Sequence, residues 1–459
     1  MTRIRTPVPL NRAGSRILVK NFCNSVDSVS SVRETKTLIG HEAPEIDRER
    51  CMDRIALLKN PIQEYAWGSK TAIQTLLGLP VPSEKPAAEL WLGAHPKAPS
   101  EVMIDGEWQS LEKVIERDPV SVLGKGVAER FSKKLPFLFK VLAADHPLSI
   151  QVHPNLEEAR EGFERENRLG ISLDAFERNY KDANHKPEIL CAITSFEGLK
   201  GFRTPEDIID LMAKVSVSTL SDELSRLRKE PDASGLKRFF TSLLSMDQAR
   251  RERVIDEAIR GAERCVNEDR AFYWMVELDR EYPGDIGVLS PLIFNLMELG
   301  PGEAIYIPAG ELHAYLRGVG MELMANSDNV LRGGLTPKHV DVPELLKIVN
   351  FISEPVLKVK PHPGELPGEK IYASPAEEFQ LSVISVANGD LFISERDRGV
   401  EIMICMEGEA RIKDLESGQV ETVEKGKSLL IPSALGQYRI VGKATLYKAT
   451  VGIADQTRQ

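Results

Sequence analysis

Hydrophobic and polar positions alternate between Leu148 and Asn155, in the order Leu-Ser-Ile-Gln-Val-His-Pro-Asn. A period of two predicts a β-strand, because successive side chains of a strand point to opposite faces of its sheet. Ser149, Gln151 and His153 then share one face. An exposed face could carry these polar side chains at little cost, but a buried face would have to supply partners or a ligand for them. The direction of this face therefore decides whether the segment belongs to a site.

Other stretches of the chain predict further strands and one helix. Strands and turns are expected to dominate residues 54–95, and residues 135–145 have the aromatic and β-branched content of a buried strand. The short apolar run 188–193 follows Pro187, a residue strongly disfavoured inside a helix, so it also predicts a strand. The charge-rich segment 156–180 has the spacing of a helix.

A longer helical segment is expected in the middle of the chain. Thr204 can cap a helix with Pro205 at its first position and two acidic residues in its first turn. Apolar residues then recur at helical spacing to about residue 279, and a Pro-Gly pair at 283–284 ends the pattern. We therefore expect a helical insertion over residues 204–284.

The segment from Gly302 to His313 carries the spacing Gly-x5-Pro-x-Gly-x2-His. Gly302 would turn the chain into a strand, Pro308 and Gly310 would shape the next turn, and His313 would begin the returning strand. This spacing resembles the second sequence motif of the cupin β-barrels, which aims such a histidine into the barrel. The asparagine that usually stands four residues after that histidine is replaced by Arg317.

A weaker copy of this motif occurs near the C-terminus. Gly408 is expected to close a strand, and residues 426–432 repeat the Gly-x5-Pro spacing with no histidine after it. We therefore expect a mainly β fold with two cupin-type (jelly-roll) β-barrel domains and an inserted α-helical domain, and metal ligands only in the first barrel. The expected parts are an N-terminal extension (1–51), the first barrel domain in two pieces (52–203 and 285–355), the helical insertion (204–284) and a C-terminal cupin-like domain (356–459).

Composition narrows the class of protein. A chain of 459 residues with 42% hydrophobic side chains is too long for one typical core and can fill several. Its apolar runs fall short of the roughly 20 residues that span a bilayer. A net charge of −10 argues against a nucleic-acid surface. The five scattered cysteines contain no Cys-x-x-Cys pair, so we expect reduced thiols and a cytoplasmic protein.

The N-terminal segment differs from the rest. Its first 26 residues contain five Lys or Arg and no acidic residue, which weakly resembles a transit peptide. We expect residues 1–51 to be a disordered tail or an over-extended start, with Met52 as an alternative initiator.

Gln151, His153, Glu188 and His313 come from three strand-like segments, which a small barrel would bring onto one interior wall. Two imidazoles and a carboxylate suit Zn²⁺ with an open position for water or substrate. Glutamine is an uncommon fourth ligand, and its neutrality would leave the ion a stronger Lewis acid. The alternative is that both histidines are ordinary strand residues.

Cationic residues surround these candidate ligands in the sequence. Lys186 stands two residues before Glu188, while Arg332 and Lys338 lie in a glycine-flanked loop with few acids. Arginine supplies planar paired donors and lysine a point charge, so the two can converge on a phosphate. The alternative is a solvated surface loop, but in an acidic protein the composition favours an anionic ligand.

Glu322 lies in an apolar strand, where it must be paired, exposed or functional. A carboxylate among apolar neighbours has a raised pKa and becomes a usable proton shuttle near neutrality. An uninterrupted strand would place Glu322 on the face opposite to His313. Because Gly318 and Gly320 are expected to make a turn, the alternation leaves its direction open, and a structural ion pair is the alternative.

Several further segments make the chain resemble the type I phosphomannose isomerases, which are zinc-dependent mannose-6-phosphate isomerases. The likeness covers about residues 54–453. The segments that carry it are Tyr65–Gly68, Ala88–His95, Leu135–Leu142, Leu148–Asn155, His185–Glu188, Phe196–Arg203 and Ser327–Lys338. The resemblance implies one Zn²⁺ per chain and the reversible conversion of mannose 6-phosphate to fructose 6-phosphate through an enediol, which feeds or drains the mannose and GDP-mannose pathway.

The resemblance also implies roles for single residues. It makes Gln151, His153, Glu188 and His313 the zinc ligands. Around the sugar phosphate it places Ser149, Lys186, Arg332, Lys338, Trp67 and Tyr315. The catalytic proton donors and acceptors stay open among Glu322, His185, Lys186 and Arg332.

Two other classes of protein could use the same ligands. One is a non-catalytic metal cupin that binds a phosphosugar as a sensor or store, and the other is a cupin oxygenase, which usually prefers iron. The sugar phosphate is the only partner that we expect, and a monomer is expected rather than an obligate oligomer.

Overall fold

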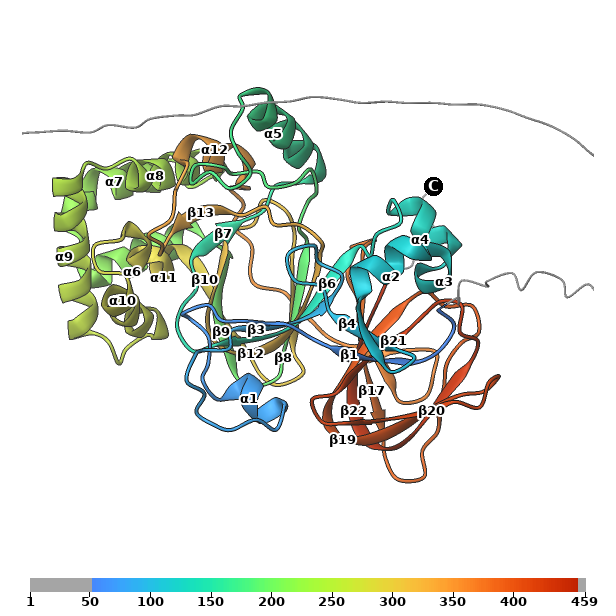
Figure 1. Ribbon diagram of the computed structural model, residues 1–459. Helices are drawn as coiled ribbons and strands as arrows, with labels where there is room; N and C mark the ends of the chain where they lie inside the picture. The colour runs from blue at the N-terminus through green and yellow to red at the C-terminus, as the bar shows by residue number, and fades with distance from the viewer. Residues whose placement is uncertain (1–51, 453–459) are drawn as a thin grey trace, which may run out of the picture. The chain divides into compact units, whose positions relative to one another are not determined.

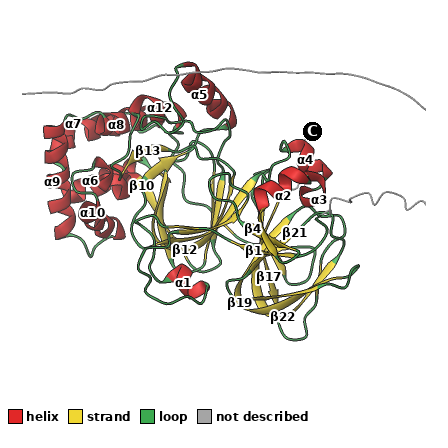
Figure 2. Ribbon diagram, viewed as in Figure 1, coloured by secondary structure: helices red, strands yellow, loops and turns green. Residues whose placement is uncertain are grey.

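The computed structural model describes residues 52–452, and Figures 1 and 2 show its helices and strands. The expectation for residues 1–51 lies outside the described residues. The prediction of a mainly β chain is confirmed, because strands from two large sheets make up most of its ordered structure. The strands are β1 (Ala56–Lys59), β2 (Ile62–Gln63), β3 (Glu89–Gly93), β4 (Glu101–Ile104), β5 (Glu107–Ser110), β6 (Phe137–Ala144), β7 (Ile150–Val152), β8 (Glu188–Ala192), β9 (Phe196–Phe202), β10 (Phe294–Leu299), β11 (Ala304–Ile307), β12 (His313–Ala325), β13 (Leu331–Gly334), β14 (Lys358–Val359), β15 (His362–Pro363), β16 (Glu369–Tyr372), β17 (Gln380–Val386), β18 (Phe392–Ile393), β19 (Glu401–Asp414), β20 (Val420–Glu424), β21 (Ser428–Ile431) and β22 (Tyr438–Thr450).

The helices are spread along the chain, and α6 to α11 follow one another between residues 205 and 293. They are α1 (Ala72–Leu76), α2 (Leu111–Arg117), α3 (Pro119–Leu123), α4 (Lys125–Arg130), α5 (Leu156–Arg168), α6 (Pro205–Val215), α7 (Ser221–Lys229), α8 (Ala233–Leu244), α9 (Gln248–Arg264), α10 (Arg270–Glu281), α11 (Ser290–Ile293) and α12 (Val342–Ile348), with short 3₁₀ turns at Ser218–Leu220 and Ile286–Leu289. None of the helices in residues 52–452 combines the length and the apolar character that crossing a membrane requires.

The strands form two sheets of antiparallel pairs. The first, here called the central sheet, has the order β14-β11-β8-β12-β6-β3-β2, with β7, β9, β10 and β13 joined beside it. The second, here called the C-terminal sheet, has the order β15-β16-β17-β22-β19-β21-β1-β4-β5, with β18 and β20 beside it. The C-terminal sheet thus includes three strands from residues 56–110. The division into domains by residue range stays a prediction.

Strand β12 organises the central sheet, because it pairs with four others. Its first residues pair with β7 and β9, and its later residues pair with β6 and β8. It runs without a break from His313 to Ala325, so the turn expected at Gly318 and Gly320 is wrong.

A bulge in β12 settles the direction of Glu322. The register with β9 shifts between Tyr315 and Arg317, which places one extra residue in β12. One extra residue reverses the alternation of side chains, so that His313 and Glu322 face the same side of the strand. The two chain neighbours of Glu322, Met321 and Leu323, instead pack into a hydrophobic core on the other side.

The predicted strands of the site are present, some of them shorter than expected. The strand expected over 148–155 is only Ile150–Val152, because Pro154 ends it and the capping box of α5 begins at Asn155. The strands β6 and β8 confirm the predictions for 135–145 and 188–193. The Gly-x5-Pro-x-Gly-x2-His segment forms β11, a turn and the start of β12, as predicted.

Two predictions about helices and strand ends are wrong. Helix α5 ends at Arg168 rather than continuing to residue 180, because residues 169–180 form a loop around the buried Arg178, whose guanidinium donates to the carbonyls of Ile171 and Tyr180. Strand β19 continues through Gly408, which adopts a positive φ of 77° next to a register shift instead of closing the strand. The short helices α2 to α4 were not predicted from the sequence.

The helices α6 to α10 lie together along the side of the central sheet that contains β9 and β10 (Figure 1). Thr204 caps α6 as predicted, with its hydroxyl oxygen accepting from the backbone N–H of Asp207. Aromatic side chains join these helices to the sheet: the Phe202 ring meets those of Phe240 and Phe294 edge-on at 5.4 and 5.2 Å between centroids. This core supports the strands that lead into the site.

Helix packing gives a test of the fold. A Cβ added at Gly261 in α9 would lie 2.1 Å from the carbonyl oxygen of Val215 at the end of α6. We expect Gly261→Ala to lower the free energy of unfolding by about 1–3 kcal/mol, because overpacking forces the backbones apart. The measurement is the midpoint of thermal unfolding followed by circular dichroism. The control is Gly126→Ala in α4, where a Cβ meets nothing within 4 Å; an equal loss in both variants would contradict the packing argument.

Candidate metal centre

Three buried side chains meet where strands of the central sheet begin or end. Glu188 is the first residue of β8, His313 is the first residue of β12, and His153 directly follows β7. One possible ligand atom from each lies within 4.8 Å of the other two. Glu188 reaches both rings, with Oε1 3.6 Å from His153 Nε2 and Oε2 3.3 Å from His313 Nε2.

Backbone carbonyls fix the orientation of both imidazole rings. His153 Nδ1 donates to the carbonyl of Asn329 at 2.6 Å, and His313 Nδ1 donates to the carbonyl of Glu311 at 3.0 Å. A carbonyl only accepts, so the proton of each neutral ring is on Nδ1 and the lone pair of Nε2 faces Glu188. Among residues 52–452, His153 Nε2 is buried without a hydrogen-bond partner. Two lone pairs facing a carboxylate fit a bound cation.

Two members of the cluster, His153 and Glu188, are in the protonation states that bind a metal. Burial lowers the pKa of His153 to about 4, and the charge of Lys186 adds to this effect. Burial alone would raise the pKa of Glu188, but the nearby charge of Lys186 holds it well below its usual value. Lys186 Nζ lies 2.9 Å from Glu188 Oε1. A neutral imidazole and an ionised carboxylate need no deprotonation before they bind a metal.

Gln151 lies directly beside this cluster. It belongs to β7, two residues before His153, and it stands opposite His313 of β12 and Arg332 of β13 in the two neighbouring strands. Gln151 also lines the cavity above the cluster. The register therefore explains how a glutamine, a histidine and an arginine from three strands come to lie next to one another.

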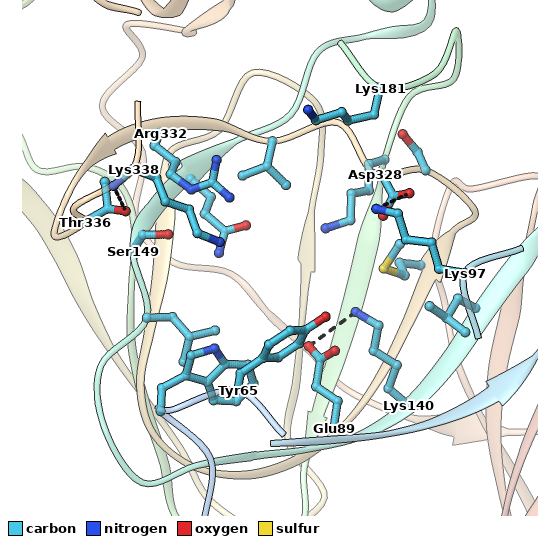
Figure 3. Close-up of a pocket in the computed structure, with 18 of the residues that line it drawn as sticks. Tyr65, Glu89, Lys97, Lys140, Ser149, Lys181, Asp328, Arg332, Thr336 and Lys338 are labelled. Carbon is cyan, nitrogen blue, oxygen red and sulfur yellow. Dashed lines mark hydrogen bonds and ion pairs between the residues drawn. The ribbon is translucent and has the colours of Figure 1, made fainter. Parts of the chain in front are cut away.

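Figure 3 shows a cavity of about 620 Å³. Gln151 and Lys186, which are neighbours of the cluster, belong to its lining. Its lining contains six cationic side chains and two carboxylates, in a chain whose net charge is −10. The charged residues of the lining are Lys97, Lys140, Lys181, Lys186, Arg332, Lys338, Glu89 and Asp328. Such a concentration of positive charge attracts an anion.

One side of the cavity has unpaired cations. Arg332, Lys338 and Ser149 lie together there (Figure 3), and within residues 52–452 neither cation has an ion-pair partner. Burial lowers the pKa of Lys338, and the neighbouring charge of Arg332 lowers it further. A dianionic group bound between them would relieve this repulsion.

A buried ion-pair network adjoins the cavity, whose lining includes Lys140 and Glu89 but not Glu322. Lys140 Nζ lies 2.8 Å from Glu322 Oε2 and 3.6 Å from Glu89 Oε1, while the indole of Trp91 donates to Glu89 at 2.6 Å. Burial raises the pKa of Glu322, against the opposing charge of Lys140. Burial alone would lower the pKa of Lys140, but the charges of Glu322 and Glu89 raise it instead.

Sequence reasoning missed several of these residues. Lys140 could have been found, because it is a charge inside the apolar run 135–144 that predicted a buried strand. Lys97 and Asp328 form an ion pair of 2.9 Å at the other side of the cavity (Figure 3). Nothing in their spacing along the chain marks them as neighbours.

The other predicted site residues differ in position. Trp67 lines the cavity. Tyr315 is buried beside His313, with ring centroids 6.0 Å apart, and its hydroxyl has no hydrogen-bond partner in the described part of the chain. His185 is not part of the lining, and its Nε2 lies 2.6 Å from Glu378 Oε1. The structure thus brings most of the predicted residues to one cavity and holds His185 beside it.

The buried His153–Glu188–His313 cluster is a candidate metal site, and it lies beside a cavity lined by cations. The family profile of the phosphomannose isomerase type I catalytic domain matches residues 55–205. The mannose-6-phosphate isomerase of Escherichia coli K12 is 40% identical over 390 residues, covering 85% of this chain and 97% of that protein. The mouse mannose-6-phosphate isomerase is 36% identical, covering 72% and 82%.

Solved structures agree with the sequence comparison. A zinc-bound mannose 6-phosphate isomerase has a TM-score of 0.80 at 38% identity, with 87% of this chain and all of that chain covered. A point mutant of the phosphomannose isomerase of Salmonella typhimurium gives the same values. The chain belongs to the type I phosphomannose isomerase family, which confirms the resemblance predicted from its sequence.

The geometry of the cluster predicts a loss of metal binding on truncation of one ring. We expect His153→Ala to bind Zn²⁺ at least tenfold more weakly, because it removes the nitrogen that faces Glu188 without a partner. Metal content after dialysis against a weak chelator measures this. His146→Ala, which removes an exposed histidine paired with Glu281, is the control. Full metal retention in the His153 variant would contradict the assignment.

Proposed function

We propose that this protein is a mannose-6-phosphate isomerase that converts mannose 6-phosphate and fructose 6-phosphate into each other with one bound Zn²⁺. The observation that supports it most directly is the His153–Glu188–His313 cluster beside a cation-lined cavity, in a chain 40% identical to the E. coli enzyme. The zinc-bound state of a structural relative adds to this support.

His153, Glu188 and His313 would hold the zinc, with Gln151 as a neutral fourth ligand. The two Nε2 lone pairs and the ionised carboxylate are ready to bind. When bound, Zn²⁺ acts as a Lewis acid toward the oxygen atoms of the substrate. A neutral glutamine offsets less of the positive charge of the ion than a second carboxylate would, so the ion stays a stronger Lewis acid.

The unpaired cations would bind the phosphate. Arg332 offers paired donors and Lys338 a point charge, with the Ser149 hydroxyl on the same side of the cavity. The sugar would then extend from this side toward Lys186 and the metal cluster, with Trp67 in the cavity wall. Such fixed placement holds the reacting carbons near the acid–base groups.

The isomerisation moves two protons. One leaves C2 of the aldose and one arrives at C1, while a proton is lost from O2 and another is gained at O1, so that atoms balance overall. We propose Glu322 for the transfer between C2 and C1, because its burial raises its pKa and it faces the same side as His313. Lys140, whose Nζ lies 2.8 Å from Glu322 Oε2, would stabilise the ionised carboxylate. Lys186 and Arg332 border the same space, while His185 would act from beside it through its pair with Glu378.

The finer architecture is also a proposal. The two antiparallel sheets and the glycine-shaped turn before His313 support two cupin-type (jelly-roll) barrels, with residues 204–284 inserted in the first. We further propose a monomer in the cytoplasm that supplies or drains mannose phosphates.

A direct assay tests the proposed function. We expect purified protein to form fructose 6-phosphate from mannose 6-phosphate in a coupled assay, to lose this activity on dialysis with a chelator, and to regain it with Zn²⁺. A sensor would bind the sugar phosphate without turnover, and an oxygenase would require iron and consume O₂. Either result would contradict an isomerase.

The role of Glu322 has its own test. We expect Glu322→Gln to keep its zinc but to lose about 10²- to 10⁴-fold in turnover, the usual contribution of an acid–base group. Turnover and the exchange of the C2 hydrogen with solvent are measured together. The control is Glu369→Gln, which changes another buried glutamate paired with a lysine, Lys448, in the C-terminal sheet. Near wild-type hydrogen exchange in the Glu322 variant would move the role to another residue.

A further inference from the structure

Asn329 is fully buried in the loop between β12 and β13, next to Asp328 of the cavity lining. Its side-chain oxygen accepts from the backbone N–H groups of Lys181 and Asp182, at 2.7 and 3.2 Å. Its side-chain nitrogen donates to the backbone carbonyls of Asp182 and Asn184, each at 2.8 Å. The side-chain amide of Asn329 thus uses its nitrogen and its oxygen for hydrogen bonds to one neighbouring segment, residues 181–184.

The segment that Asn329 holds leads directly into the site. Residues 181–184 come just before Lys186 and Glu188, and Lys181 itself lines the cavity. The loop that carries Asn329 leads in turn to Arg332. The side chain of Asn329 therefore joins the two loops that bring cations to the cavity.

A second layer of hydrogen bonds supports this junction. The Ser327 hydroxyl donates to Asp182 Oδ1 at 2.8 Å, and the backbone N–H of Asp328 donates to Asp182 Oδ2 at 2.7 Å. The backbone N–H of Asn329 in turn donates to Ser327 Oγ at 3.2 Å. Every member of the network is bonded to the opposite loop or to its neighbour, which gives the junction one defined arrangement.

The backbone of Asn329 also contacts the metal centre. Its carbonyl accepts from His153 Nδ1 at 2.6 Å, the bond that turns His153 Nε2 toward Glu188. Because the side chain fixes where this carbonyl lies, it also fixes the ring of the ligand. Partners of this kind behind a ligand typically change metal affinity or activity by about 10- to 100-fold when altered.

We propose that Asn329 is a positioning residue that couples the zinc ligand His153 to the two loops that contact the substrate. This inference rests on the proposed zinc-dependent isomerase, and adds to it a residue that touches neither metal nor substrate through its side chain. Only an amide offers an acceptor and two donors in this geometry, so neither aspartate nor leucine can replace it.

The test uses Asn329→Asp in the full-length protein. The substitution keeps the shape and the acceptor but removes the donors to Asp182 and Asn184. We expect the Zn²⁺ dissociation constant, measured by competition with a chromogenic chelator, to rise about 10- to 100-fold. We also expect the visible absorption of the Co²⁺-substituted protein to change, and kcat to fall even when the site is saturated with zinc.

Asn295→Asp is the matched control. The Asn295 amide likewise donates to backbone carbonyls, those of Phe202 and Glu354, both at 2.9 Å, but none of its partners lines the cavity or belongs to the metal cluster. A merely structural role predicts similar effects of both variants on zinc affinity and the Co²⁺ spectrum. That result, or an unchanged zinc affinity in Asn329→Asp, would overturn the proposal.

Two further arms keep the outcome clear. If Asn329→Asp does not fold, Ser327→Ala removes the hydroxyl that links Asp182 to the backbone of Asn329, and the same shift in zinc affinity is expected in smaller measure. The unsubstituted protein is assayed alongside for zinc and turnover. If it lacks both, the proposed function fails together with this inference. If it has both while the variants at Asn329 and Ser327 match Asn295→Asp, only the inference fails.

Discussion

The structure depends on keeping the Glu188 carboxylate ionised inside the protein. A buried charge costs several kcal/mol of free energy unless it is compensated, and here Lys186 and two imidazoles surround it. The imidazoles can offer Nε2 to a metal only because backbone carbonyls hold their protons on Nδ1. The charges, the ring orientations and the loop that carries Asn329 therefore belong to one arrangement, and the rest of the central sheet brings its parts together.

The central sheet achieves this with a single long strand. β12 supplies His313 at one end and Glu322 further along, and it pairs with β6, β7 and β8, which carry Lys140, Gln151 and Glu188. The bulge near Tyr315 gives both residues the same direction. A regular strand of the same length would have turned the raised-pKa carboxylate into the hydrophobic core that holds Met321 and Leu323.

Whether a feature could be predicted from the sequence depends on how close along the chain the residues that define it are. Period-two alternation, Thr204 as a cap and the Gly302–His313 spacing depend on neighbours in the chain, and these predictions are confirmed. The alternation left the direction of Glu322 open, and the turn expected at Gly318 and Gly320 is wrong, because a bulge is defined by the register with another strand. The pairs Lys140–Glu322 and Lys97–Asp328 join residues about two hundred positions apart, so no pattern along the chain could have announced them.

The C-terminal sheet has a consequence for how the chain reaches this state. Its strand β21 pairs with one edge of β1, and β4 pairs with the other edge. Residues near position 56 therefore form backbone hydrogen bonds with residues near position 430. Contacts at such sequence separation form late and slowly, since the loop between them must close first. During synthesis, β1 leaves the ribosome long before its partner exists. One edge of β1, the first strand of the described chain, therefore stays unpaired until the residues of β21 have been synthesised.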